Sequence, residues 1–164
     1  MEKPARDARV FTIATFGIGA TGTEGDFRMS IQLSVEPLIK AVQRLEEGLD
    51  RYHQNVNDIQ IRDGLVQRFE FTYELSHKIL KRYLEMNSPN PAEFDQMVFA
   101  NMIRSGNEQG LLSRDWSVWK NFREMRGATS HAYDEVIAMK VVGAIPEFLQ
   151  EAKFLVNQLQ ARLA

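Results

Sequence analysis

The fold of this chain is decided by residues 58–86, which read DIQIRDGLVQRFEFTYELSHKILKRYLEM. Apolar residues recur there every three or four positions, the spacing that places side chains on one face of an α-helix. Asp58 carries a short carboxylate that can cap the free N–H groups of a first helical turn. The stretch therefore predicts a long, heavily buried central helix. Its apolar face consists of Ile61, Leu65, Phe69, Thr72, Ile79 and Tyr83, widened by Val66, Tyr73 and Leu80.

Two segments on either side of this helix show the same periodicity. The segment 34–53 predicts a helix that tolerates Pro37 in its first turn. The turn at residues 88–91, which contains two prolines, cannot continue a helix, so we expect a third helix after it that runs to Gly106. The two apolar stripes are Leu38, Val42, Leu45 and Leu49 for the first of these segments, and Phe94, Met97, Val98, Met102 and Ile103 for the second.

The last third of the chain predicts two more helices after a connection at Gly110. The fourth is indicated by Trp116, Trp119, Phe122 and Met125, and Asp134 can cap a fifth. The stripe of the fifth is Ile137, Val141, Ile145, Phe148, Ala152, Leu155 and Leu159. An interior proline removes one hydrogen bond and clashes with the preceding turn, so we expect Pro146 to kink or split this helix. Together the segments predict an all-α, up-and-down bundle of about five helices.

The composition is that of one globular domain. A chain of 164 residues with 44% hydrophobic and 26% charged residues is long enough to bury a core. The absence of cysteine excludes disulfides and a thiol nucleophile, and it suits a reducing cytoplasm. Three scattered histidines give no evident metal cluster, so we expect neither a metal nor a cofactor. A formal charge of −2 means that any contact with RNA must come from a local patch or a dimer groove.

The first 28 residues differ from the rest because they lack a helical stripe. They contain a G-x-G-x-x-G match at Gly17, Gly19 and Gly22, but no helix signal follows at once, as a dinucleotide site would require. The apolar run is too short and too interrupted to span a membrane. We therefore expect a poorly ordered leader or a misassigned start codon, whose deletion leaves stability nearly unchanged.

Residues 126–133 read RGATSHAY and contain an R-x4-H-x-Y arrangement. Arg126 can bind a phosphate bidentately, and His131 can move a proton near neutral pH, which together suit cleavage of RNA. Residues five apart on a continuous helix diverge by about 140°. We therefore expect the helix to end between them, with Gly127 in a left-handed C-terminal position. Nearby Lys120 and Arg123 contribute to a modest positive patch that can bind RNA phosphates.

Two sequence blocks carry a resemblance to a known family. The blocks QRFEFTYEL at residues 67–75 and TSHAYDE at residues 129–135, with Arg126 before the second, resemble HEPN domains of the HepT type. Proteins of this type are often labelled nucleotidyltransferase substrate-binding proteins. The resemblance runs from about Met29 to the C-terminus, and it implies a HEPN-like bundle over residues 29–164. It also implies a ribonuclease toxin whose homodimer lines one groove with two copies of Arg126 and His131.

The same resemblance implies a partner and leaves an alternative open. The partner is a nucleotidyltransferase similar to the MntA antitoxin, which would switch off the ribonuclease by adenylylating Tyr133. Two positions depart from the family pattern: Gly127 stands where a polar Asn or Asp is usual, and His77 where Trp is common. If the polar residue orients the phosphate or the motif arginine, its loss leaves a degenerate enzyme. The alternative is therefore a non-catalytic substrate-binding subunit of a nucleotidyltransferase.

The candidate residues also have structural interpretations. Arg126 can serve as a helix-end cation that complements the helix dipole, and His131 can be a structural residue at a helix start. The ring of Tyr133 can pack into the bundle instead of facing solvent. Trp116 and Trp119 are expected to anchor the core or a dimer interface.

Residues of the central helix outside its apolar face have structural interpretations as well. The ring of His77 is expected to pack against the bundle. Glu70 and Glu74 lie one turn apart and can form an acid/base pair, but we expect them to be solvated or paired with Lys78.

Overall fold

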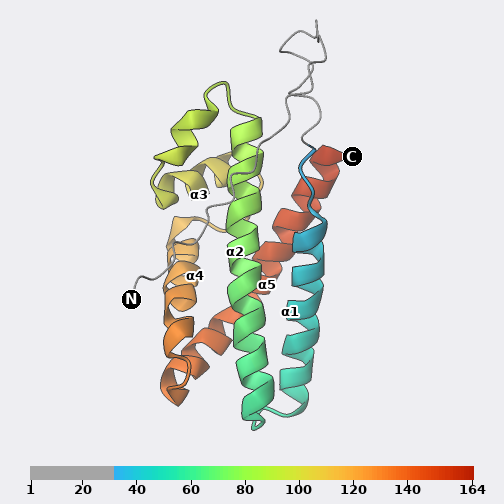
Figure 1. Ribbon diagram of the computed structural model, residues 1–164, viewed down its shortest axis with the longest axis vertical. Coiled ribbons are helices and arrows are strands. Elements are labelled where there is room, and N and C mark those ends of the chain that lie inside the picture. The colour runs from blue at the N-terminus through green and yellow to red at the C-terminus, as the bar shows by residue number, and fades with distance from the viewer. Residues whose placement is uncertain (1–31) are drawn as a thin grey trace, which may run out of the picture. The chain divides into compact units, whose positions relative to one another are not determined.

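The computed structural model describes residues 32–164, and these residues form an all-α fold (Figure 1). No strand occurs within this range, so the predicted fold class is confirmed. The helices are α1 (Glu36–Gln54), α2 (Ile59–Met86), α3 (Phe99–Glu108), α4 (Trp116–Ala128) and α5 (Glu135–Leu163), with 3₁₀ turns η2 (Pro91–Asp95) and η3 (Thr129–His131). The predicted leader over residues 1–28 lies outside the described residues, and the predicted boundary at residue 29 stays a prediction.

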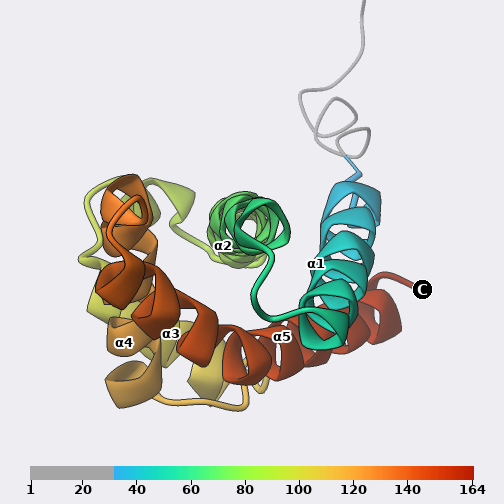
Figure 2. The ribbon, with the colours of Figure 1, turned by 90° about the horizontal axis from the view of Figure 1, so that it is seen from below.

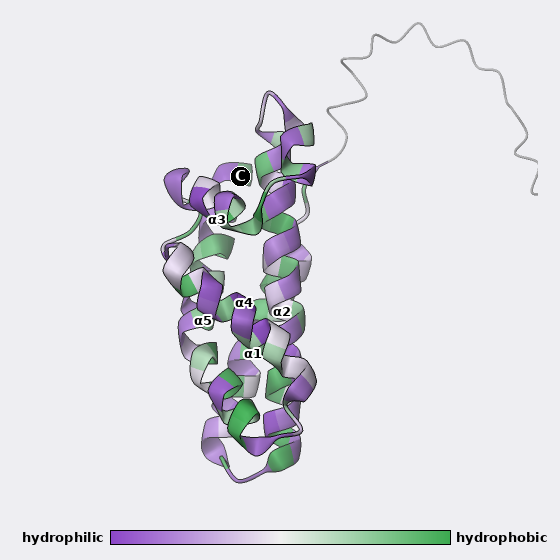
Figure 3. Cartoon of the chain, turned by 90° about the vertical axis from the view of Figure 1, so that its left-hand side faces the viewer, coloured by the Kyte–Doolittle hydropathy of each residue, from purple (hydrophilic) through white to green (hydrophobic). Residues whose placement is uncertain are grey.

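Helix α2 lies at the centre of the bundle, as its long apolar face predicts. Viewed along the bundle, α1 flanks it on one side, α3 and α4 on the other, and α5 passes across a third side (Figure 2). Along each helix, short hydrophobic stretches alternate with hydrophilic ones (Figure 3). The remaining side of α2 carries exposed or half-exposed polar residues, namely Gln67, Glu70, Glu74 and Lys78.

Aromatic rings from α2, α4 and α5 form the middle of the core. Their centroids lie between 5.1 and 6.3 Å apart, within the range of favourable ring contacts. The rings belong to Phe69, Tyr73, Trp119, Phe122 and Phe148. Trp119 is fully buried, which confirms its expected role as a core anchor, whereas Trp116 is half-buried against Phe99. Full burial of each such ring contributes about 1.5–3 kcal/mol to folding.

Aspartate caps fix where three of the helices begin. The Asp58 carboxylate accepts hydrogen bonds from the N–H groups of Gln60 and Ile61, and the Asp134 carboxylate accepts one from Ile137. Both caps match the sequence prediction. Asp115 caps α4 in the same way.

A buried carboxylate ties the start of α4 to α5. Glu151 on α5 has no exposed surface, and its two oxygens accept hydrogen bonds from four donors. The donors are the N–H and the hydroxyl of Ser113, the N–H of Arg114 and the indole N–H of Trp119. The buried Glu151 carboxylate and the buried indole N–H of Trp119 therefore both have hydrogen-bond partners.

The third helix begins later than its apolar spacing predicts. Phe94 lies in the separate turn η2, Val98 has an extended backbone, and α3 begins at Phe99. The turn begins at Pro91 and is anchored by the buried Phe94 side chain, so one apolar stripe is shared by two short elements. Helix α3 also ends two residues beyond the predicted Gly106.

Two connections in the second half of the chain can be compared with prediction. Gly110 adopts φ 72°, a left-handed conformation that favours glycine, and it lies near the start of the predicted connection after α3. Pro146 does not split the fifth helix, because α5 is continuous from Glu135 to Leu163. The buried side chains Ile145, Phe148 and Leu149 hold both sides of the proline against the core.

None of the helices described between residues 32 and 164 combines the length and the apolar character needed to cross a membrane.

Candidate functional site

Arg126 lies in the last turn of α4 and reaches across to α2. Its Nε donates a hydrogen bond to Glu74 Oε1 at 2.9 Å, and its Nη2 forms an ion pair with Glu70 Oε1 at 3.2 Å. Its Nη1 lies 3.4 Å from the hydroxyl oxygen of Thr129. A guanidinium has five N–H donors, so this arrangement leaves two of them free for a ligand. We call Arg126, Glu70 and Glu74 the arginine clamp.

The clamp corrects the pairing expected for the two glutamates. Glu70 and Glu74 lie one helical turn apart on the open side of α2, but their partner is Arg126 and not Lys78. Lys78 is exposed and forms no ion pair within the described part of the chain. Arg126 can pair with both glutamates at once because its guanidinium is forked, whereas the ammonium group of Lys78 is a single point charge. The motif arginine is thus a cross-link between helices, and its role at the helix end is secondary.

The expectation for Gly127 was wrong. The residue lies inside α4, which continues to Ala128, and within residues 32–164 only Gly110 has a positive φ. The change of direction comes instead from η3, where the hydroxyls of Thr129 and Ser130 donate to the carbonyls of Arg126 and Gly127. These bonds close the helix end without a left-handed residue, because hydroxyl side chains satisfy its last carbonyls.

His131 and Tyr133 lie beside each other on the exposed link between α4 and α5. Their ring centroids are 6.2 Å apart, and both side chains face solvent. The Tyr133 side chain is 87% exposed, so the alternative in which it packs into the bundle is wrong. No hydrogen bond or ion pair joins His131 to Arg126 among the described residues. Within one chain Arg126 is therefore paired with its two glutamates, and His131 lies beside Tyr133.

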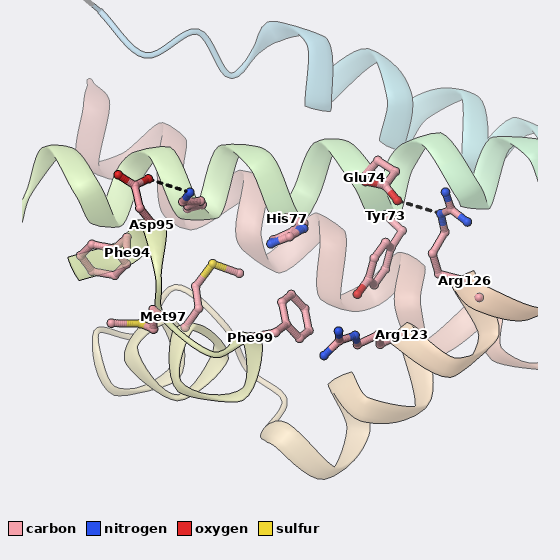
Figure 4. A pocket seen from close by; sticks show the side chains of 12 residues that line it. Tyr73, Glu74, His77, Phe94, Asp95, Met97, Phe99, Arg123 and Arg126 are labelled. Atoms are coloured by element: carbon pink, nitrogen blue, oxygen red, sulfur yellow. Dashed lines mark hydrogen bonds and ion pairs between the residues drawn. The ribbon is translucent and has the colours of Figure 1, made fainter. Parts of the chain in front are cut away.

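A cavity of about 670 Å³ opens next to the clamp, between α2, α4 and the segment from η2 to α3 (Figure 4). Glu74, Arg126 and Gly127 line the end nearest α4, and the paired Lys81 and Asp95 line the opposite end. Between them lie the side chains of Tyr73, His77, Phe94, Met97, Phe99, Met102 and Arg123. Its size lies within the range of small-molecule sites in proteins.

The two cations predicted to bind phosphate differ in position. Arg123 lines the cavity with its guanidinium carbon 5.0 Å from the centroid of the Phe99 ring, a cation–π arrangement. Lys120 is exposed on α4 and does not line this cavity.

The interior of the cavity contains two polar rings with shifted pKa values. Burial raises the pKa of the Tyr73 hydroxyl to about 12, with Arg123 opposing the shift. Burial lowers the pKa of His77 below its ordinary value, and the neighbouring Glu74 carboxylate offsets only part of this effect. The His77 ring meets Phe99 edge-on at 4.9 Å, so the expected packing against the bundle is confirmed. The lowered pKa also makes His77 a neutral donor and acceptor at pH 7.

A second, smaller hollow of about 260 Å³ lies on the other side of the clamp. It is lined by Glu70, Thr129 and Tyr133, together with Asp63, Val66, Gln67 and Ala132. Since Arg126 contacts Glu74 in the first cavity and Glu70 in the second, the clamp forms the wall between the two. Within residues 32–164 no three His, Cys, Asp or Glu side chains are grouped so that they could hold a metal ion.

Sequence patterns did not reveal Tyr73 and Phe99 as site residues. Tyr73 belongs to the apolar stripe of α2, which indicates a core residue, and only its hydroxyl end reaches the cavity. Phe99 is the first residue of a helix whose start was misplaced. A polar tip on an otherwise buried stripe is the one signal that can identify Tyr73.

Comparisons with known proteins agree on one group of relatives. The family described as nucleotidyltransferase substrate binding protein like matches residues 33–161. A curated protein of Haemophilus influenzae named probable ribonuclease HepT is 41% identical over 99 residues, which cover 60% of this chain and 67% of that protein. A solved structure from the same organism is described as the fold of a substrate-binding domain of a nucleotidyltransferase. It superposes with a TM-score of 0.72 at 34% identity and covers 77% of this chain and 99% of its own.

Proposed function

We infer that this chain, which belongs to the family of nucleotidyltransferase substrate-binding-like proteins, is a metal-independent ribonuclease of the HepT type. The observation that carries the proposal is the position of Arg126, whose guanidinium is held at the edge of an open cavity with two N–H donors free. The R-x4-H-x-Y motif and the 41% identity to a probable ribonuclease support the same conclusion.

The proposed reaction uses the ribose 2′-hydroxyl as the nucleophile. His131 removes the proton from this hydroxyl, or donates one to the leaving oxygen, a role that contributes roughly two to four orders of magnitude in rate. Arg126 binds the phosphate and stabilises the charge that grows on its oxygens in the transition state. The need for a 2′-hydroxyl selects RNA over DNA.

We expect a homodimer to place two copies of Arg126 and His131 around one groove. Within one protomer Arg126 is paired with its glutamates and His131 lies beside Tyr133, and we propose that a two-fold axis brings the two motifs to one groove, as in the commonest closed assembly. The exposed residues Val136 and Met139 support this arrangement, because they continue the face of Tyr133 along the first turns of α5. We place this apolar face at the dimer interface, with Tyr133 at the rim of the groove.

The partner proposed for this chain is a nucleotidyltransferase that resembles the MntA antitoxin, in a toxin–antitoxin pair with a HEPN-type ribonuclease. Tyr133 is the proposed acceptor of the nucleotidyl group, and its phenol is accessible because the side chain is almost fully exposed. An added AMP would bring a negative phosphate to the hollow lined by Glu70 and Tyr133, where it competes with RNA for Arg126. We propose a cytoplasmic location, which suits a chain without cysteine.

The decisive experiment is cleavage of single-stranded RNA by the purified full chain in the presence of EDTA. We expect activity that is lost in Arg126→Ala and in His131→Ala. The matched controls are Arg104→Ala and His53→Ala, two exposed residues outside the site that should cleave like the unaltered chain. Activity that requires Mg²⁺, or that survives His131→Ala, rules out the proposed mechanism.

The modification has its own test. Incubation with ATP and a nucleotidyltransferase of the proposed partner class should add one or more AMP units to the intact mass, and Tyr133→Phe should abolish the adduct. An unchanged mass for the original chain, or an adduct that persists in Tyr133→Phe, removes Tyr133 from this role.

The alternative is a non-catalytic substrate-binding subunit, and one observation favours it. Gly127 lacks the polar side chain that is usual in the family at this position, and a Cβ added there meets no atom within 4 Å. The backbone around Gly127 therefore has room for the Cβ of a side chain. An inert chain that gains ribonuclease activity through Gly127→Asn would identify it as a degenerate enzyme.

A further inference from the structure

The cavity beside the clamp contains a polar group without a partner. The Tyr73 side chain is 4% exposed, and its hydroxyl points toward Phe99 and Arg123 in the cavity (Figure 4). Within the described residues this hydroxyl makes no hydrogen bond, although Trp119, the aromatic neighbour of Tyr73, pairs its indole N–H with Glu151. Because this hydroxyl opens onto the cavity, water or a ligand that enters the cavity can supply its hydrogen-bond partner.

We propose that this cavity binds the base of an RNA nucleotide adjacent to the phosphate that Arg126 holds. The inference rests on the proposed ribonuclease function and adds a base-binding subsite to it. The subsite consists of Tyr73, His77, Phe99 and Arg123.

The walls of the cavity match the chemistry of a base. Unstacked RNA bases pack on aromatic rings and on Arg guanidinium planes. The Arg123 guanidinium lies over one face of the Phe99 ring, 5.0 Å from its centroid, and the His77 ring meets Phe99 edge-on, so three planar groups are gathered in one wall of the cavity. The Tyr73 hydroxyl can donate and accept a hydrogen bond, and the two nitrogens of a neutral His77 provide one donor and one acceptor. Alternating donors and acceptors of this kind lie along the edges of the bases.

The distribution of charge fixes the orientation of the bound nucleotide. The two carboxylates that line the cavity are already paired, Glu74 with Arg126 and Asp95 with Lys81. The free N–H donors of Arg126 at the α4 end suit a phosphate. The middle of the cavity contains no carboxylate, so it suits an uncharged ring. A nucleotide therefore fits with its phosphate at Arg126 and its base between Tyr73 and Phe99.

The test measures binding without cleavage. Fluorescently labelled hexanucleotides with 2′-O-methyl groups cannot undergo attack by the 2′-hydroxyl, and a matched set replaces one base at a time by an abasic residue. Binding of the full chain to each probe is followed by anisotropy. We expect one abasic position to weaken binding by about fivefold or more, as stacking on protein aromatics does.

The variant Tyr73→Phe links that base to the cavity. It should weaken binding of the intact hexanucleotide by about fivefold, the effect of one hydrogen bond, and leave binding of the critical abasic probe unchanged. Phe99→Leu should behave in the same way with a larger loss. The matched control is Tyr52→Phe, which also removes a hydroxyl from a buried tyrosine but lies outside the cavity.

The outcomes separate this subsite from the ribonuclease function. Equal weakening of both probes by Tyr73→Phe, or no weakening of either, overturns the subsite even if the chain cleaves RNA. If Tyr73→Phe weakens binding of the intact probe alone and the chain cleaves no RNA, the base-binding subsite is supported and the ribonuclease function is ruled out. A chain that binds none of the hexanucleotides overturns the subsite, and the cleavage assay then decides the function separately. Competition by AMP, GMP, CMP or UMP that disappears in Tyr73→Phe also supports the subsite, and would show that free nucleotides enter it as well.

Discussion

Helix α4 is held by carboxylates at both of its ends, and the two ends differ in how completely those carboxylates are enclosed. At the first end, Glu151 is fully buried and accepts bonds from four donors that have no other partner. At the second end, Glu70 and Glu74 bind Arg126 at the border of two hollows, and all three side chains remain partly exposed. The first arrangement is closed to solvent and the second is open to it.

The two ends of α4 therefore differ in their contribution to folding stability and in how easily their charged groups can bind a ligand. A buried donor such as the indole N–H of Trp119 cannot bond to water when it loses its acceptor, so removing the Glu151 carboxylate is costly. An exposed ion pair contributes little to folding because solvent screens it and can replace it. The clamp is therefore suited to release its arginine to a phosphate, and the Glu151 network is suited to hold the helix in place.

The largest expected effect is the loss of folding stability in Glu151→Ala. The substitution leaves the buried indole N–H of Trp119 and three partly buried donors of Ser113 and Arg114 without their acceptor, so we expect the free energy of unfolding to fall by about 2 kcal/mol or more. Glu74→Ala removes a side chain that is 40% exposed and should cost less than about 1 kcal/mol. Urea unfolding followed by circular dichroism measures both. Equal losses of unfolding free energy in Glu151→Ala and Glu74→Ala would show that the two ends of α4 contribute equally to folding.

The next effect concerns RNA affinity at the open end. Glu70→Gln removes a negative charge 3.2 Å from Arg126 without shortening the side chain. We expect a hexanucleotide with 2′-O-methyl groups to bind about three- to tenfold more tightly, because a nearby like charge no longer opposes the phosphate. The matched control is Glu46→Gln, which breaks a similarly exposed ion pair with Lys153 on another face. Weaker binding by Glu70→Gln would mean that the glutamate orients Arg126 and does not compete with the phosphate.

A smaller effect is the pH dependence that His77 contributes to stability. Because its pKa is lowered in the folded state, mainly by burial, the unfolded chain binds its proton more readily. The contribution of His77 to stability is therefore complete above its ordinary pKa of about 6.5 and is lost as pH falls toward the lower folded value. His77→Gln should flatten the decline between pH 7 and pH 5, whereas His53→Gln, at an exposed position on α1, serves as the control. A decline that keeps its full slope in His77→Gln would contradict this assignment.

The smallest expected effect tests the backbone at the open end. Gly127 lies within α4 with space around it, so Gly127→Ala should stabilise the fold by about 0.5–1 kcal/mol. Gly110→Ala is the matched contrast, because φ 72° penalises any side chain, and we expect it to destabilise the fold by about 1 kcal/mol. Thermal unfolding of both variants decides the point. Destabilisation by Gly127→Ala would instead support the sequence prediction that Gly127 adopts a left-handed conformation at the helix end.

The parts of the fold that were predictable from sequence are those with local causes. The apolar spacing of α2 and the caps Asp58 and Asp134 each act within a few residues, so the sequence displays them directly. The start of α3 could not be predicted in this way. Periodicity does not distinguish one helix from a turn and a helix that share a stripe, as Phe94 and Phe99 do.

The candidate site was less predictable because its contacts join distant segments. The motif identified Arg126, and the exposure of Tyr133 agreed with its position before a helix cap. The binding of Arg126 to Glu70 and Glu74 depends on how α4 packs on α2, which the i,i+4 rule does not describe. The cavity lined by Tyr73 and Phe99 arises from three elements and has no signature in any one of them.

The shared wall formed by the arginine clamp makes the two hollows thermodynamically linked. Arg126 lines the cavity of Glu74 and is paired with Glu70 of the second hollow, so we expect an anion that draws Arg126 toward one hollow to lower the affinity of the other for an anion. Such antagonism is reciprocal, since a coupling free energy belongs to the pair of sites and to neither alone. If the proposed function holds, a group attached at Tyr133 is expected to weaken RNA binding in the neighbouring cavity through Arg126, without a change of fold.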